Sequence, residues 1–96
     1  MRRDEVIRRL EQCAAEFERF GVVSVRLFGS TARDEADDGS DVDIIAEFKR
    51  PLTFRRFMGF RLFLEEQLET KVDLVTERGL RDRVRPQVER DAIRVA

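Results

Sequence analysis

The first twenty residues carry apolar side chains at helical spacing. The positions on this face are Val6, Ile7, Leu10, Ala14 and Phe17, with Cys13 beside them. A repeat of three to four residues places side chains on one face of an α-helix. We therefore predict a helix that starts at Asp4, a residue suited to capping, and runs to about Phe20, with Gly21 as its C-terminal stop.

Shorter apolar runs farther along the chain have the composition of β-strands. They cover residues 22–28, 42–48 and 72–75, and a last short strand is predicted over 92–95. Alternate residues of a strand face the same way. In the first strand we therefore expect Val23, Val25 and Leu27 to share one side.

Helical segments are predicted between these strands. The longest runs from Thr53 to Glu69, after a break at Lys49-Arg50-Pro51, and shorter ones are predicted over 30–36 and 80–90, with a turn at 37–40. The apolar face of the longest helix is expected to hold Phe54, Phe57, Met58, Leu64 and Leu68, widened by Phe60, Leu62 and Phe63. Helices that alternate with strands predict a single α/β domain over residues 1–96, a sheet with helices packed on it.

Three carboxylates lie on or beside two of the predicted strands. Asp41 and Asp43 are two residues apart, so both side chains leave the same face, while Val42 and Ile44 point to the core. Asp73 interrupts the next apolar strand and joins the pair if the two strands are neighbours. Such oxygen ligands suit Mg²⁺ bound together with a nucleoside triphosphate, and one carboxylate can accept a proton. An aspartate pair at a strand entrance is otherwise often a solvated turn.

A glycine turn precedes the carboxylate pair by ten residues. Gly29 allows the backbone to approach a phosphate closely, and Ser30 adds a hydroxyl and an N–H at a helix start. Arg33 is placed to pair with a phosphate, although a surface arginine is nearly as good an explanation. A plain strand-to-helix turn is the alternative for Gly29 and Ser30. The conjunction of turn, pair and third aspartate favours the functional interpretation.

The amino-acid composition limits which functions and catalytic groups are available to this chain. The 96 residues have a formal net charge of -1, which gives no argument for direct nucleic-acid binding. The absence of histidine leaves a carboxylate as the general base, and the absence of tyrosine places any tyrosine acceptor on another molecule. One cysteine, Cys13, is expected to pack in the core. No apolar run approaches the roughly 20 residues of a membrane helix, and we expect a cytoplasmic protein.

The segment from Gly29-Ser30 through Asp41-Val42-Asp43 to Asp73 resembles the minimal nucleotidyltransferases of the DNA polymerase β superfamily. Their signature is Gly-Ser, ten residues, Asp-x-Asp and a distal Asp, matched here in order across positions 22 to 75. Asp34 departs from the glycine that many members have after the arginine, which affects the turn near the phosphates. The resemblance implies a mixed sheet flanked by helices and transfer of a nucleoside monophosphate from a triphosphate.

The resemblance also implies roles and a partner. Asp41 and Asp43 would hold two Mg²⁺ ions, Asp73 would help bind one and activate the acceptor, and the glycine turn would grip ATP. Many minimal members are antitoxins that add AMP to a tyrosine of a HEPN-family toxin, an RNA-cleaving helical protein. The short chain leaves little room for an acceptor-binding domain, so a protein acceptor is favoured.

Two alternatives stay open from the sequence. The chain would also suit an antitoxin that neutralises its partner by contact alone, with or without bound nucleotide. It would also suit one subunit of a small-molecule nucleotidyltransferase, although the missing acceptor sequence argues against that. A calcium site is disfavoured because no calcium-loop spacing is present.

Overall fold

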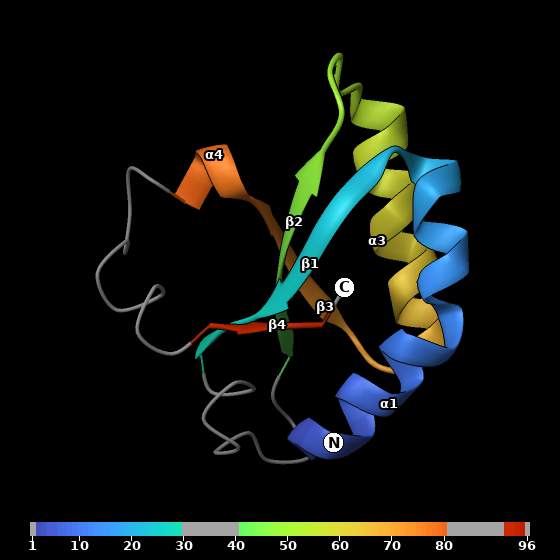
Figure 1. The fold of residues 1–96 in the computed structure, drawn as a ribbon, viewed down its shortest axis with the longest axis vertical. Helices are drawn as coiled ribbons and strands as arrows, with labels where there is room; N and C mark the ends of the chain where they lie inside the picture. The colour runs from blue at the N-terminus through green and yellow to red at the C-terminus, as the bar shows by residue number, and fades with distance from the viewer. Residues whose placement is uncertain (1, 30–40, 81–91, 96) are drawn as a thin grey trace.

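The computed structural model describes residues 2–29, 41–80 and 92–95 (Figure 1). Within these ranges, four strands form one sheet in the order β3-β2-β1-β4. Their bounds are Val22–Leu27 for β1, Val42–Phe48 for β2, Val72–Thr76 for β3 and Ile93–Arg94 for β4. Strand β2 runs antiparallel to β1 and parallel to β3, and β4 is antiparallel to β1. The predicted mixed sheet is confirmed.

The helices lie mainly on one side of this sheet. Helix α1 is Arg3–Cys13, α3 is Phe54–Leu68, and the 3₁₀ helix η1, Ala14–Phe20, continues directly from α1. Helices α1 and α3 lie side by side against one face, whereas the short α4, Glu77–Leu80, lies on the other side (Figure 1). Within the ranges that the structure describes, no helix is long and apolar enough to cross a membrane.

The predicted first helix is wrong in its second half. The α-helix ends at Cys13, and residues 14–20 form a 3₁₀ helix. A 3₁₀ helix has three residues per turn, so Phe17 and Phe20 lie above one another. Both rings then reach Phe60, at centroid distances of 5.3 and 5.4 Å. Gly21 ends the segment with φ +72°, which confirms the predicted stop.

The start of α1 also differs from the prediction. Arg2 is the N-cap and makes no side-chain capping hydrogen bond. Asp4 lies inside the first turn, where a carboxylate interacts favourably with the positive end of the helix dipole. Cys13, at the other end, is buried, which confirms its packing role, and burial raises the pKa of its thiol.

Alternate residues of the strands build the core beneath α1 and α3. Phe60 of α3 is fully buried at its centre. Besides the two η1 rings, Phe60 contacts Phe48 at 5.7 Å in an edge-to-face arrangement and Phe63 at 6.2 Å. The strand residues of this core are Val22, Val25, Leu27, Val42, Ile44, Ala46, Val72 and Leu74.

One expected member of the core is missing from β1. Val23 is 48% exposed although it was predicted to share a face with Val25 and Leu27. The pairing register of β1 with β2 shifts between Val22 and Ser24. A β-bulge of this kind inserts one residue and reverses the alternation before it. Val22 therefore enters the core in place of Val23.

Helix α3 is one residue shorter at each end than the predicted 53–69, because Thr53 and Glu69 are its caps. The Thr53 hydroxyl accepts a hydrogen bond from Arg56 N at 3.1 Å and caps the start, and Glu69 ends the helix at φ +55°. Phe54 was expected on the apolar face but is 80% exposed. Successive residues of an α-helix are rotated by about 100°. Phe54 therefore lies at the margin of the buried face that contains Phe60, and Leu62 lies on the opposite side of the helix from that face. Leu62 is accordingly 59% exposed.

Some of the remaining predicted strands and helices lie within the described residues, and others lie outside them. Strand β2 has its predicted bounds, and β3 extends one residue beyond its prediction, to Thr76. Strand β4 is shorter than its predicted four residues. The helix predicted over 30–36 and the turn at 37–40 lie outside the described residues. The same holds for the helix predicted over 80–90, except Leu80, which ends α4.

Candidate functional site

The face of the sheet opposite α1 and α3 carries two of the three predicted carboxylates. Asp43 of β2 and Asp73 of β3 are register partners in the parallel pair. Neighbouring strands lie about 4.8 Å apart, and partners of equal register share a face. Asp43 is half-buried and Asp73 is exposed, whereas their chain neighbours Val42 and Val72 are buried beneath the helices. The expected adjacency of these two strands is confirmed.

The glycine turn lies directly against Asp43. Gly29 has φ +62°, and the preceding Phe28 donates its N–H to the Asp43 carbonyl oxygen at 3.1 Å. A Cβ atom added at Gly29 would lie 2.5 Å from Asp43 Oδ2. Both the positive φ and the close approach require glycine here. Ser30 and Arg33, the other predicted phosphate ligands, lie outside the described residues.

Replacing Gly29 with alanine is expected to destabilise the protein and to displace the Asp43 carboxylate. A residue with Cβ in this left-handed conformation costs roughly 1–2 kcal/mol, and its clash falls on the carboxylate oxygen. Urea unfolding of Gly29→Ala measures the first effect. Gly59→Ala is the matched control, since its Cβ would lie 3.7 Å from Phe20 Cε1. Because Gly59 lies inside α3, that change should stabilise by about 0.5–1 kcal/mol. Equal effects of the two changes would contradict this account.

Asp41, the third predicted carboxylate, is exposed and immediately precedes β2. Asp43 and Asp73 supply carboxylate oxygens, the donors that Mg²⁺ prefers, and Gly29, which has no side chain, lies against the Asp43 carboxylate. In the part of the chain that the structure describes, however, no three acidic or cysteine side chains converge as ligands of one metal ion. The donor chemistry therefore fits Mg²⁺, while only Asp43 and Asp73 are paired by the sheet.

The surroundings of the carboxylate pair were not foreseen from the sequence. Arg26 of β1 lies on the same face and forms an ion pair with Glu77 of α4, Nη2 to Oε1 at 2.7 Å. Beside it, Ile45 is buried in a small apolar cluster with Phe28, Val75 and Ala92. The alternation of β1 contained a signal, since Arg26 is a charged residue between two apolar residues, at a position facing away from the core. This cluster lies on the same face of the sheet as Asp43 and Arg26.

A separate hollow of about 650 Å³ lies at the other ends of β2 and β3. Its lining residues are Ala46, Glu47, Phe48, Arg50, Pro51, Leu52, Thr76, Glu77 and Arg78. The lining starts three residues beyond Asp43 on β2 and three beyond Asp73 on β3. The hollow is therefore distinct from the carboxylate pair.

The arrangement of sheet, glycine turn and paired carboxylates defines a class of enzyme that transfers nucleotidyl groups. Residues 7–95 match the family model described as "Nucleotidyltransferase domain", and the chain belongs to this family. A solved structure assigned as a minimal nucleotidyltransferase shares 41% identity with it. That similarity covers 97% of this chain and 95% of the other, with a TM-score of 0.83. The resemblance seen in the sequence and the expected fold are confirmed.

Two further relatives carry more specific descriptions. The protein adenylyltransferase MntA of Thermococcus cleftensis is 37% identical over 78 residues, which are 81% of this chain and 79% of that protein. A structure of a tri-AMPylated HEPN toxin of Shewanella oneidensis in complex with its MNT antitoxin matches with a TM-score of 0.66. It is 19% identical and covers 94% of this chain and 71% of the other, so this likeness shows the fold alone.

Proposed function

We propose that this protein is an antitoxin that transfers AMP from ATP to a tyrosine of a HEPN-family toxin. The in-register pairing of Asp43 with Asp73 beside the Gly29 turn is the observation that carries the proposal. Its support includes the adenylyltransferase name of the 37% identical relative and the AMPylated toxin in the complex of similar fold. We further propose that residues 1–96 act as one domain in the cytoplasm.

The reaction needs an acceptor from outside the chain, which contains no tyrosine. The tyrosine oxygen would attack the α-phosphorus of ATP, a new P–O bond would form, and the bond to the β-phosphate oxygen would break. Pyrophosphate would leave with the electron pair of that bond. Since the chain has no histidine, the hydroxyl proton would pass to a carboxylate, and we assign this role to Asp73.

We assign two Mg²⁺ ions to Asp41, Asp43 and Asp73. Bound there, Mg²⁺ would neutralise charge on the triphosphate and polarise the reacting phosphoryl group. Gly29 would let the backbone approach the triphosphate, with Ser30 and Arg33 contributing a hydroxyl and a guanidinium. Asp41 would join its two partners only when cation and nucleotide offset the mutual repulsion of the three carboxylates.

Intact mass spectrometry tests the proposal. The product of the neighbouring gene, which the proposal expects to be a HEPN-family toxin, is incubated with this protein, ATP and Mg²⁺, and a mass gain of one or more AMP units is expected. Fragmentation should locate the added AMP on tyrosine. EDTA in excess over Mg²⁺ should abolish the gain. No mass gain with any triphosphate, or a gain that survives metal removal, would contradict the proposal.

Contact alone is a second candidate mechanism of neutralisation. The exposed apolar residues Phe54 and Leu62 of α3 favour it, because large exposed apolar side chains are common at protein interfaces. Changing Asp41 and Asp43 together to asparagine separates the two mechanisms. If the double variant still neutralises the toxin without adding AMP, contact is sufficient.

A further inference from the structure

The connection between α3 and β3 is fixed by side chains at both of its ends. Glu65 of α3 accepts a hydrogen bond from the backbone N–H of Val72, with Oε2 3.0 Å from the nitrogen. Val72 is the first residue of β3 and immediately precedes Asp73. The Glu65 side chain is 23% exposed and Val72 is buried, so this bond is largely shielded from water.

The same stretch of backbone also holds the start of β2. Val42 donates its N–H to the Lys71 carbonyl oxygen at 3.0 Å. Lys71 and Val72 share one peptide group, whose carbonyl therefore accepts from β2 while its N–H donates to Glu65. Peptide groups are planar and rigid, so these two hydrogen bonds together hold the Lys71–Val72 peptide group in place. Asp43 follows Val42 and Asp73 follows Val72, each one residue away.

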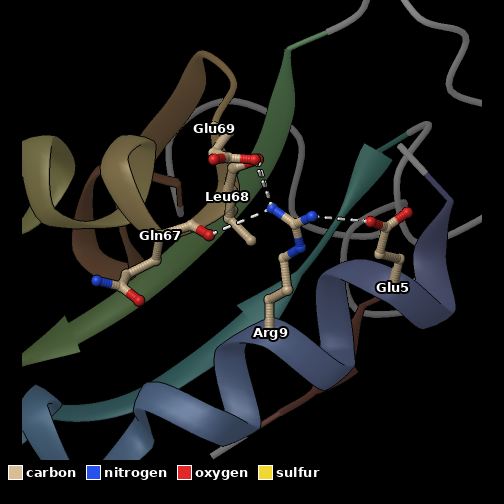
Figure 2. Close-up of polar contacts among 5 residues, drawn as sticks. All are labelled: Glu5, Arg9, Gln67, Leu68 and Glu69. Atoms are coloured by element: carbon tan, nitrogen blue, oxygen red, sulfur yellow. Dashed lines mark hydrogen bonds and ion pairs between the residues drawn. The ribbon is translucent and has the colours of Figure 1, made fainter.

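Arg9 of α1 secures the other end of the connection (Figure 2). Its Nη1 donates to the Leu68 carbonyl oxygen at 3.4 Å and lies at the same distance from Glu69 Oε2. Its Nη2 pairs with Glu5 at 3.1 Å, which holds the guanidinium in place. The last carbonyls of a helix lack intrahelical partners, so a cation here stabilises the helix end.

Strand β3 needs such support because it is the terminal strand of the sheet among the described residues. Only β2 pairs with it there, so hydrogen bonds of the sheet fix it from one side. The register of Asp73 opposite Asp43 then depends on where β3 begins. Glu65 sets that point from the helix beneath the sheet.

We propose that Glu65 is a positioning residue for nucleotidyl transfer, which holds Asp73 opposite Asp43 through the Val72 N–H. This inference rests on the proposed function of Asp73. Toward Val72, Glu65 accepts a hydrogen bond, which an amide oxygen also does. Glutamine would lose only the 3.8 Å ion pair of the same oxygen with Arg61, and i,i+4 pairs of this kind contribute little to stability. Glu65→Gln should therefore keep the position of Asp73, whereas Glu65→Ala should lose it.

The test compares Glu65→Ala and Glu65→Gln in AMP transfer to the partner protein. We expect kcat to fall about tenfold to a hundredfold for the alanine variant, the order expected for a displacement of about 1 Å. The KM for ATP should change little, and Glu65→Gln should restore kcat to within about threefold. Val6→Ala, a cavity in the core under α1, is the control for destabilisation and should leave kcat unchanged.

Hydrogen–deuterium exchange gives a readout that is independent of activity. The Val72 and Asp73 amides should exchange normally in Glu65→Gln and faster in Glu65→Ala. Val6→Ala lowers global stability and should speed the exchange of all core amides alike, whereas Glu65→Ala should act selectively on Val72 and Asp73. Normal exchange and normal kcat in Glu65→Ala, or a glutamine variant as impaired as the alanine variant, would overturn the positioning role. If instead Asp73→Asn leaves transfer intact, the proposed function of Asp73 fails, and the exchange data show separately whether Glu65 fixes β3.

Discussion

Asp43→Asn is expected to lower the rate of AMP transfer by roughly a thousandfold. The change removes a negative charge and a metal ligand but keeps the shape of the side chain. A loss of several kcal/mol of transition-state stabilisation, at about 1.4 kcal/mol per tenfold, gives this magnitude. Single-turnover transfer, followed by mass spectrometry of the partner protein, measures it. A matched titration with Mn²⁺ and ATP should show weaker metal binding.

Glu47→Gln is the control for Asp43→Asn. Glu47 lies on the same face of β2, four residues along, and it is exposed. The Glu47→Gln substitution removes the same unit of charge, at a position about 13 Å along the strand from Asp43. Transfer by this variant should stay within about twofold of the wild-type rate. Equal losses in both variants would indicate a general effect of charge and would remove Asp43 from the metal site.

Phe60→Ala should be the most destabilising single substitution among those considered. Phe60 is fully buried, and four aromatic rings surround it at centroid distances of 5.3 to 6.2 Å. Removal of a buried phenylalanine ring typically costs 3–5 kcal/mol, from lost transfer free energy and an unfilled cavity. Small domains are stable by about 5–15 kcal/mol, so a large share of the folding free energy would be lost. Urea denaturation followed by circular dichroism measures the effect.

Phe54→Ala provides a comparison on the same helix. The side chain of Phe54 is 80% exposed, so its removal should change the free energy of unfolding by no more than about 0.5 kcal/mol. If both phenylalanines cost the same, the described core is wrong. If Phe54→Ala leaves stability unchanged but weakens binding of the partner protein, Phe54 belongs to a docking surface.

The spacing of apolar residues predicted the major helices and strands of this fold, because burial of one face of an element imposes a regular spacing on its sequence. The helical spacing in α3 follows from a single buried side, and in β2 the alternation of Val42, Ile44 and Ala46 follows from the face buried under the helices. The sequence could not show the bulge that exposes Val23, because it depends on pairing with β2. Nor could it show that α1 gives way to a 3₁₀ helix, which depends on the position of Phe60 across the core.

The candidate site was predictable in part, for a related reason. Residue types and spacing brought Gly29, Asp43 and Asp73 together as one hypothesis, and the fold places Asp43 beside both Gly29 and Asp73. The hydrogen bond from Val72 N to Glu65 joins a helix to a strand and leaves no repeat in the sequence. The Arg26–Glu77 ion pair likewise depends on contacts that only the folded chain creates.

The alternation along β2 has a consequence for how this protein can evolve. Val42, Ile44 and Ala46 stabilise the fold from one face of the strand, while Asp43 and Glu47 belong to the other face and point away from that core. Selection can therefore act on chemistry and on folding through different residues of one strand. A descendant that lost Asp43 would keep its core, and with it any surface that recognises a partner. Active and inactive copies of such a chain can thus arise from one another by single substitutions, without passing through an unfolded intermediate.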